Sequence, residues 1–300
     1  MKLIQRASRI IYLRGFFILF TLVILITCGV FSPAASAQES AAVFSDTGAI
    51  VPQWRSFASG ISFLHGRITS PRLEFWALQI DLLSPNTRIV VRGGTIENGR
   101  TFSTRVSSFT RDNNLIAGIN AVPFDNVSSR EGQPILNMGI VISDGVVIAQ
   151  ANRHYDAIVF YDDGRAEIVS QSSIRSMENI KNAVGGFYKI LSGGQPAQRT
   201  LNNEARHPRS AAGVSINGRR LYLLVIDGRR AGSVGATEHE TALLLRSLGS
   251  WDGINFDGGG SSALAMRNSD GRIRVVNTPV HSGIPGQERA VAGCLGVTSY

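Results

Sequence analysis

One short stretch of the chain, INFDGGGSSALAM, places an acid before three glycines and two serines after them. The glycines are Gly258, Gly259 and Gly260. Because glycine has no Cβ, the backbone here can approach a ligand closely, and successive N–H groups can converge on an anion. Asp257 and Ser261 add a carboxylate and a hydroxyl beside that turn. We interpret the stretch as a ligand-binding loop; a flexible turn without a ligand is the alternative.

Two arginines bracket a predicted hairpin that precedes this loop. Its strands, AAGVSI and RRLYLLVI, are joined through Asn217–Gly218, a pair that favours a tight two-residue turn. Arg209 precedes the first strand and Arg229 follows the second, so both belong at the same end of the hairpin. Two guanidinium groups at one place suit a phosphate. The alternative is that Arg229 and the neighbouring Asp227 decorate a sheet edge with surface ion pairs.

Other catalytic motifs are missing or incomplete. Neither Gly-Lys-Ser/Thr nor a GxGxxG that opens a helix is present, which argues against a nucleotide-binding loop. A serine hydrolase would use His207 or His239 as base, but no Gly-x-Ser-x-Gly elbow surrounds the candidate nucleophiles Ser261 and Ser262. Metal ligands at informative spacing are also absent, so we predict no cofactor and assign no metal.

The helix that the sequence indicates most clearly spans residues 237–248, TEHETALLLRSL. Thr237 and Glu240 have the spacing of a capping box, and Gly249 supplies a stop. The apolar stripe of this helix is expected to pack on a sheet. Directly after it, WDGINF has the character of a short buried strand, and the glycine stretch follows at its carboxyl end. This helix and this strand are therefore expected to position the loop.

Strands dominate the rest of the chain. Asn-Gly or Asp-Gly pairs recur between runs rich in β-branched residues and predict hairpins, at Asn98–Gly99, Asp144–Gly145, Asp163–Gly164, Asn217–Gly218 and Asp270–Gly271. We therefore expect a predominantly antiparallel sheet. Two further helices are predicted, over residues 173–183 and 104–111. The predicted fold class is α+β, with a few helices packed on the sheet in a single domain.

The first 37 residues have the three parts of a secretory signal sequence. Four basic residues come first, an apolar run covers residues 16–31, and Ala35-Ser36-Ala37 forms a small-residue cleavage site. We predict a signal peptide over 1–37, a flexible lead-in over 38–55 and a folded domain over 56–300. The protein is then secreted or periplasmic. A membrane anchor formed by uncleaved residues 16–31 and a lipoprotein processed at Cys28 are the alternatives.

The composition fits an ordinary folded domain with a mild preference for anionic partners. The formal charge is +8 for the whole chain and falls to +4 without residues 1–37, which carry four basic residues and no acid. No run of lysine or arginine indicates nucleic acid binding. Once Cys28 leaves with the signal, Cys294 stands alone, so no internal disulfide is possible. An ordinary hydrophobic core must therefore stabilise the domain.

As an ordered set, several stretches of the chain resemble the phosphodiester glycosidases, a family that includes the enzyme removing α-linked N-acetylglucosamine from a phosphodiester. The matching stretches are GINAVPF, NAVGGFYKILSGG, HPRSAAGV, VIDGRR and SVGATEHETALLLRSLGSWDGINFDGGGSSAL, followed by Arg289 before VAGCLGV. Together they extend over roughly residues 75–300. One departure is that Ala121, Val122 and Pro123 follow Asn120 where the family usually has two glycines. A differently shaped floor of the site is implied.

The resemblance implies an α+β hydrolase that cleaves a sugar-1-phosphodiester at its glycosidic bond. Phosphate is already a stable leaving group, so holding its charge is the main task, while carboxylates stabilise the sugar cation, attack directly or activate water. The implied catalytic carboxylates are Asp257, Glu240 and, third, Asp227. The implied phosphate and sugar ligands are Arg209, Arg229, Arg289, Asn120, Asn255, Gly258, Gly259, Gly260 and Ser261. An alternative role for Glu240 is to serve only its own helix cap.

The implied partner is a phosphodiester-containing glycan of the cell envelope or the extracellular space. No nucleic acid is implied, and membrane contact is expected only through an uncleaved signal segment. The runner-up is a non-catalytic module that binds anionic envelope polysaccharide. The presence of carboxylates together with arginines favours the enzyme, because a binding module can dispense with the acids. The sugar, the polymer, the stereochemical outcome and the oligomeric state stay open.

Overall fold

The computed structural model describes residues 52–92, 94 and 96–299. The predicted signal segment and most of the predicted lead-in lie outside these residues, so both stay predictions, as does the anchor alternative. Within the described part of the chain, no helix combines the length and the hydropathy that a membrane crossing requires.

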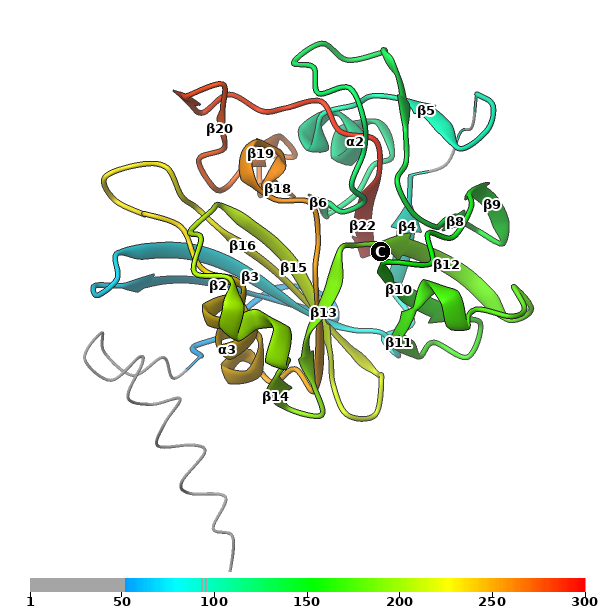
Figure 1. Ribbon diagram of the computed structural model, residues 1–300, viewed down its shortest axis with the longest axis horizontal. Coiled ribbons are helices and arrows are strands. Elements are labelled where there is room, and N and C mark those ends of the chain that lie inside the picture. Colours follow the sequence, from blue (N-terminus) through cyan, green and yellow to red (C-terminus); the bar gives the residue numbers. More distant parts are fainter. Residues whose placement is uncertain (1–51, 93, 95, 300) are drawn as a thin grey trace, which may run out of the picture.

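The largest sheet has eight strands in the order β1-β2-β3-β16-β15-β17-β13-β14 (Figure 1). In chain order they are β1 (Arg55–Ala58), β2 (Ile61–Ile68), β3 (Leu73–Asp81), β13 (Tyr188–Ser192), β14 (Gln195–Pro196), β15 (Arg209–Val214), β16 (Arg220–Ile226) and β17 (Asp252–Asn255). The central strands β3 and β16 are rich in aliphatic and aromatic residues and are buried on both faces. Other layers must therefore cover both faces of this sheet.

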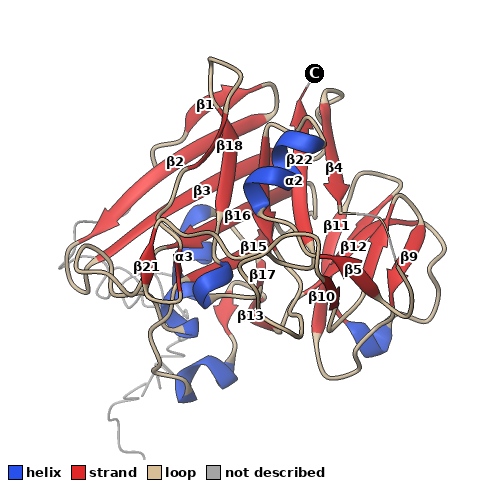
Figure 2. Ribbon diagram, turned by 90° about the horizontal axis from the view of Figure 1, so that it is seen from above, coloured by secondary structure: helices blue, strands red, loops and turns tan. Residues whose placement is uncertain are grey.

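Two further sheets have five strands each, in the orders β11-β10-β12-β8-β9 and β19-β18-β6-β22-β4. The strands of the first are β8 (Val141–Ser143), β9 (Val146–Ala149), β10 (Asp156–Tyr161), β11 (Ala166–Ser170) and β12 (Ile180–Gly185). Those of the second are β4 (Thr87–Val91), β6 (Ala117–Asn120), β18 (Leu264–Arg267), β19 (Ile273–Val275) and β22 (Cys294–Ser299). Short pairs are formed by β5 (Arg100–Phe102) with β7 (Pro134–Leu136), and by β20 (Val280–His281) with β21 (Ile284–Pro285). Figure 2 shows the strands β9, β10 and β12 on the opposite side of the molecule from β1 to β3.

The expected antiparallel pairing is confirmed for all the strand pairs among the described residues. Four of the predicted turns join paired strands: Asp144–Gly145 joins β8 to β9, Asp163–Gly164 joins β10 to β11, Asn217–Gly218 joins β15 to β16, and Asp270–Gly271 joins β18 to β19. The fifth, Asn98–Gly99, instead leads into β5, whose partner β7 lies further along the chain.

The helix predicted from its capping box is confirmed as α3 (Glu238–Leu248). Thr237 Oγ1 accepts a hydrogen bond from the backbone N–H of Glu240 at 3.1 Å, and the Glu240 carboxylate accepts one from the N–H of Thr237 at 3.0 Å. Gly249 has a φ of 110° and ends the helix in the left-handed conformation. The leucines of α3 pack on one face of the eight-stranded sheet. The other described α-helix, α2 (Val106–Asp112), confirms the prediction over residues 104–111.

The helix predicted over residues 173–183 is wrong. The chain there forms a short 3-10 turn, η1 (Gln171–Ser173), and later the strand β12. β12 is paired with β10 on one side and β8 on the other, so neighbouring strands satisfy its backbone. Its successive residues Ala183 and Val184 belong to different core clusters, because side chains alternate between the two faces of a strand. Two-sided burial overrode the local pattern.

The register of the eight-stranded sheet brings three strand ends together. The main core lies between the face of this sheet opposite α3 and the two five-stranded sheets. Arg209 pairs with Ile226, and Ala211 pairs with Asn255. The start of β15 therefore lies beside the ends of β16 and β17. Segments that are far apart in sequence, around residues 207–209, 227–230 and 255–261, converge at this edge.

Candidate active site

The glycine loop is held in place by hydrogen bonds to two other segments, residues 120–121 and Pro208. It follows β17 and contains a short 3-10 turn, η3 (Gly259–Ser261). The N–H of Asp257 donates to Ala121 O at 2.9 Å, and the N–H of Gly259 donates to Pro208 O at 2.8 Å. The side-chain amide of Asn120 donates to the backbone oxygen of Asp257 at 2.6 Å. The loop is therefore a fixed structure and not a flexible turn.

Asp257 is the acid at the centre of this arrangement. It is only partly accessible. Its carboxylate accepts hydrogen bonds from the side chain of Ser261 and the backbone of Gly258, and the charge of Arg289 lies nearby. Burial raises its pKa from the ordinary value to about 6, although these three groups act in the opposite direction. Asp257 is thus mostly ionised at neutral pH, and it becomes protonated when the pH falls below about 6.

The glycines are bare because two arginines lie against them. A Cβ on Gly259 would be 2.9 Å from Nη2 of Arg229, and a Cβ on Gly260 would be 2.6 Å from Nη2 of Arg289. Real Cβ atoms essentially never make contacts this short, so a side chain at either position must displace a guanidinium group. These residues do not form the nest of free N–H groups that we expected from the sequence. The N–H groups of Gly258, Gly259 and Ser261 are already bonded within the protein.

Arg229 and Arg289 have no carboxylate within salt-bridge distance among the described residues. Arg289 donates from Nε to Nδ1 of His281 and from Nη1 to Oγ of Ser261, both at 3.2 Å. Arg229 is exposed, has a φ of 60°, and makes one long contact of 3.5 Å to Val280 O. Burial lowers the pKa of Arg289, the charge of Asp257 raises it, and the nearby charge of Arg229 lowers it again. Two guanidinium groups without a salt-bridged acid have the chemistry that an anion site needs.

Two histidines border this pair of arginines. Burial lowers the pKa of His207, and the charges of Arg209 and Arg229 lower it further. Burial lowers the pKa of His281 too, followed by the charges of Arg289 and Arg229. Because Nδ1 of His281 accepts the bond from Arg289, its neutral form fits the geometry. Sequence reasoning missed His281; its only signal is a place between Asn277 and Arg289 in a motif-rich segment.

Arg209 lies at the predicted end of the hairpin but is used differently. Its Nε donates to Ala236 O at 2.9 Å and its Nη2 to Ala205 O at 3.0 Å. Its Nη1 is 3.7 Å from Oε1 of Glu238, a buried acid in the first turn of α3 that sequence reasoning also missed. The guanidinium of Arg209 thus ties β15 to the start of α3, so the structure does not support its expected role as a phosphate ligand.

Among the described residues, Glu240 forms no hydrogen bond or ion pair with Asp257, Arg229 or Arg289. Besides closing the capping box, its two oxygens accept hydrogen bonds from the guanidinium of Arg206 at 2.6 and 2.8 Å. Both oxygens are therefore occupied by groups of the protein. This geometry fits the alternative that the sequence left open, in which Glu240 serves its own helix; a catalytic role for Glu240 stays a prediction.

Asp227 is fully buried and also holds structure together. Its carboxylate accepts hydrogen bonds from the side chain of Asn277 and the backbone N–H of Thr278, both at 3.0 Å, and from Arg230 at 2.8 Å. Burial raises its pKa, and these bonds oppose the rise. The alternative of a surface position is therefore wrong for Asp227, and its predicted catalytic role stays a prediction. It fixes the start of the segment that carries His281 and Arg289 over the glycines.

The two asparagines differ from each other. Asn120 is buried, and its Oδ1 accepts hydrogen bonds from Ser210 and from the N–H of Ala263, so both ends of its amide position the loop. Asn255 is only 3% exposed, yet its Oδ1 has no hydrogen-bond partner among the described residues. A buried amide oxygen without a partner is costly unless a ligand or water satisfies it. Asn255 therefore has the properties of a ligand-binding residue.

The serine hydrolase alternative is not supported by the geometry. Nδ1 of His239 lies 3.2 Å from Oγ1 of Thr200, and Oγ of Ser262 is buried without a partner. Ser261 is bonded to Asp257 and Arg289. Among the described residues, no hydrogen bond joins a histidine to either serine. No group of three His, Cys, Asp or Glu side chains in that part of the chain is arranged to hold a metal ion.

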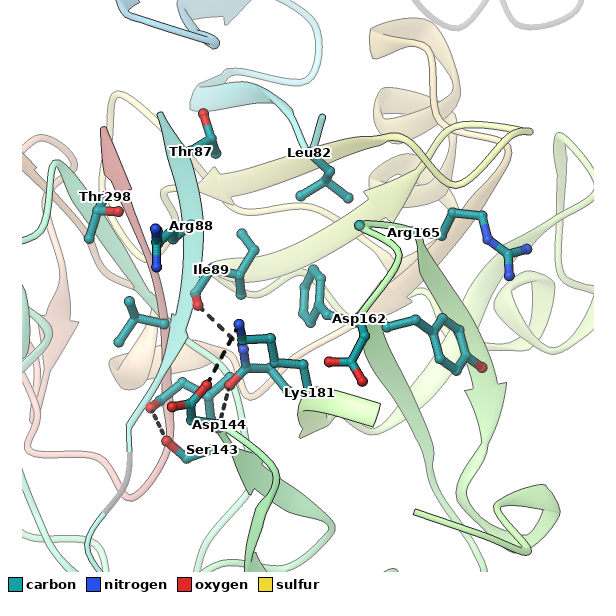
Figure 3. A pocket seen from close by; sticks show the side chains of 16 residues that line it. Leu82, Thr87, Arg88, Ile89, Ser143, Asp144, Asp162, Arg165, Lys181 and Thr298 are labelled. Carbon is teal, nitrogen blue, oxygen red and sulfur yellow. Dashed lines mark hydrogen bonds and ion pairs between the residues drawn. The ribbon is translucent and has the colours of Figure 1, made fainter. Parts of the chain in front are cut away.

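A separate cleft of about 390 Å³ lies away from this cluster, between β4 and the sheet that contains β10 and β12 (Figure 3). Figure 3 shows Lys181 and Asp144 beside one another in it, 3.8 Å apart as an ion pair. Ser143 and Asn182 donate across it to the backbone oxygens of β4. None of the predicted site residues lines this cleft. These bonds join the two five-stranded sheets.

Solved structures share this fold. The catalytic domain of zebrafish N-acetylglucosamine-1-phosphodiester alpha-N-acetylglucosaminidase, auto-inhibited by its pro-peptide, superposes with a TM-score of 0.61 at 18% identity, over 86% of this chain and 93% of that one. A hypothetical protein from Synechocystis gives a TM-score of 0.63 at 15% identity, over 84% of this chain and 64% of that one. At such identities the likeness is one of fold.

Sequence comparison extends the relationship. The uncharacterized protein YomE, derived from the SPbeta prophage of Bacillus subtilis strain 168, is 28% identical over 157 residues. The match covers 46% of this chain and 24% of YomE, so the chain spans about a quarter of that relative's length. A sequence profile of the phosphodiester glycosidases matches residues 113–298, which is more than half of the chain. The protein therefore belongs to the phosphodiester glycosidase family.

Proposed function

We propose that the protein is a hydrolase that cleaves a sugar-1-phosphodiester of the GlcNAc-α-1-phosphate type, at the bond between the anomeric carbon and the phosphate oxygen. The substrate belongs to an envelope or extracellular glycan. The protein reaches it by secretion or export to the periplasm through the predicted signal segment. Family membership and the fold shared with the zebrafish glycosidase domain support this proposal.

One observation carries the proposal: a single partly accessible acid lies beside two arginines that have no acidic partner. Asp257 with Arg229 and Arg289 has a net charge of one positive unit when the acid is ionised. A phosphodiester carries one negative charge, so it complements this group electrostatically. The raised pKa of Asp257, about 6, is suited to a general base near neutral pH.

In the proposed reaction, the guanidinium groups of Arg229 and Arg289 hold the phosphate and neutralise the second negative charge that develops on it. Asp257 accepts a proton from a water molecule, and the water oxygen forms a bond to the anomeric carbon. The bond from that carbon to the phosphate oxygen breaks, and the phosphomonoester leaves with the electron pair. Phosphate needs no proton to leave, so the reaction needs no second carboxylic acid.

The other implied residues have positioning roles in this proposal. Asn120 orients the backbone of the loop, and Asp227 fixes the segment that carries Arg289. Asn255 offers an unpaired amide oxygen to a hydroxyl or amide group of the sugar. Its partner in β13, Tyr188, shares its face of the sheet and adds an aromatic ring there.

The test is hydrolysis of a methyl phosphodiester of GlcNAc-α-1-phosphate by the purified protein, with released GlcNAc and methyl phosphate both quantified. We expect equal amounts of the two products. Asp257→Asn is expected to lower kcat/KM by roughly 10² to 10⁴, the usual contribution of a general base. Ser269→Ala removes an exposed hydroxyl in the turn between β18 and β19 and serves as the control.

The outcome that contradicts the proposal is equally specific. If the folded protein turns over neither this compound nor a panel of other sugar-1-phosphodiesters, but binds an anionic polysaccharide tightly, it is a binding module. If Asp257→Asn and the Ser269→Ala control are both fully active, the protein is still an enzyme but Asp257 is not its base.

A further inference from the structure

The end of the eight-stranded sheet opposite the Asp257 cluster carries a surface hollow of about 600 Å³. It lies where the β15–β16 hairpin turns and where α3 leads into β17. The seven residues of β16 separate it from the cluster by roughly 20 Å, at about 3.3 Å per residue. Changes in the hollow can therefore leave the cluster intact.

Three large apolar side chains meet in this hollow although they are exposed. The exposed fractions are 43% for Trp251, 72% for Ile216 and 49% for Leu83. Single exposed apolar side chains are common on protein surfaces, but several around one depression indicate a binding site. The hollow is thus a candidate for an interaction that neither the proposed reaction nor the core explains.

Trp251 forms a rigid platform there. The backbone on both sides is fixed, because its N–H donates to Val214 O and its oxygen accepts from Gly194 N–H, each at 2.7 Å. One side of the indole rests on the turn after β13: a Cβ on Gly194 would be 3.2 Å from two of its ring carbons. The ring is therefore held against backbone while part of it stays exposed. A fixed aromatic surface of this kind packs against flat, partly apolar rings.

Polar groups with unused bonding capacity surround this platform. Arg219 and Arg220 are exposed and form no ion pair with any described residue, whereas Asp81 is the acid in the lining. The lining therefore carries one net positive charge beside the exposed ring. A ligand with an apolar ring face and negative charge complements both features.

We propose that this hollow is a second glycan-binding site, which holds a sugar unit of an anionic polysaccharide against Trp251. Arg219 and Arg220 bind the charged group of the polymer. The proposal rests on the proposed function for the class of polymer. It adds that the protein binds its polymer at two places, so that long chains are held better than short fragments.

The test uses full-length protein with Asp257→Asn, which keeps the polymer intact during binding. Poly(N-acetylglucosamine α-1-phosphate) is titrated by calorimetry into this protein and into versions that also carry Trp251→Ala or both Arg219→Ala and Arg220→Ala. We expect Trp251→Ala to weaken binding by about tenfold, which is about 1.4 kcal/mol. The double arginine variant is expected to weaken binding too, and to reduce its dependence on salt.

Two further ligands separate the contributions of the ring and the charge. Binding of the neutral pentamer of N-acetylglucosamine is expected to depend on Trp251, and binding of inorganic polyphosphate on Arg219 and Arg220. Val146→Ala, which trims an equally exposed apolar residue at the start of β9, is the matched control and is expected to bind as the parent does. In protein with native Asp257, Trp251→Ala is expected to raise KM for the polymer and to leave the methyl phosphodiester unaffected.

Three results would overturn the proposal: no binding of the polymer, unchanged binding in both hollow variants, or a dimer that Trp251→Ala dissociates. The last would show that a second copy of the chain covers the hollow. If the native protein cleaves neither substrate while Trp251-dependent binding persists, the proposed activity fails and the second site stands. If cleavage is normal and Trp251→Ala does not change binding, the proposed activity stands and the second site fails.

Discussion

The guanidinium of Arg289 lies directly against Gly260, so that a Cβ at this glycine would be 2.6 Å from Nη2 and 3.0 Å from the central carbon. The same guanidinium donates to Ser261, which bonds the carboxylate of Asp257. Gly260 thus leaves the space that the guanidinium of Arg289 occupies beside Asp257. A side chain on Gly260 must displace the cation.

Gly260→Ala is therefore expected to lower kcat/KM by about tenfold or more, the scale of one lost contact to transition-state charge. The melting temperature is expected to change little, because Gly260 does not have a left-handed φ and Arg289 can move toward solvent. Steady-state kinetics and thermal unfolding of the same preparation test both points. Ser269→Ala is the control, and a Gly260→Ala enzyme of full activity would contradict the packing argument.

The pH dependence follows from the raised pKa of Asp257. If the ionised acid is the base, kcat/KM falls tenfold per pH unit once the pH drops below about 6, where burial has moved its pKa. An ordinary aspartate would place that fall near pH 4. A pH profile on the methyl phosphodiester distinguishes the two. A profile that stays flat from pH 7 to pH 5 would show that Asp257 does not act as the base.

The same shift predicts a stability effect with a definite sign. A carboxyl group whose folded pKa lies above its unfolded pKa favours the folded state when protonated, and this contribution is lost as the pH rises through about 6. At pH 7 the ionised Asp257 therefore opposes folding. Asp257→Asn is expected to unfold at the same temperature as the native protein or higher, although it loses activity. A large fall in its melting temperature at pH 7 would contradict this assignment of cause.

Replacement of Glu240 is expected to lower stability and to leave activity nearly unchanged, the opposite of Asp257→Asn. Glu240→Ala removes half of the capping box and the partner of Arg206, and is expected to destabilise the protein by about 1–2 kcal/mol. At temperatures well below unfolding, kcat is expected to stay near the native value. Thr237→Ala, which removes the other half of the box, is the comparison and is expected to destabilise similarly. If kcat falls sharply in folded Glu240→Ala but not in Thr237→Ala, Glu240 is a catalytic residue.

Asp227→Asn is expected to damage both stability and phosphate binding. The amide that replaces one carboxylate oxygen is a donor and faces the donors of Arg230, Asn277 and Thr278. Loss of one partner from a buried charged pair typically costs about 3 kcal/mol or more. Because Thr278 begins the segment that carries Arg289, inhibition by inorganic phosphate is expected to weaken as well. Unchanged inhibition in a destabilised variant would separate Asp227 from the site.

Local signals in the sequence predicted local structure well. The Thr237–Glu240 box and Gly249 predicted α3, and the Asn217–Gly218 turn predicted the β15–β16 hairpin, because caps and tight turns depend on residues that are close in the chain. The helix over residues 173–183 failed for the complementary reason. The strand there, β12, is stabilised by strands β8 and β10, which a local pattern does not contain.

By itself, the sequence determined that Asp257, the three glycines, Arg229 and Arg289 are candidates, and that Arg209 and Arg229 share one end of a hairpin. Only the tertiary structure decided which of them face one another. The sequence pattern predicts where the backbone of a residue lies. The charged group of an arginine or glutamate is several bonds away from that backbone, so its contacts depend on the surrounding fold. The fold turned Arg209 and Glu240 toward α3 and its cap, and brought Arg289 onto Gly260, because packing across 28 residues of chain sets that contact.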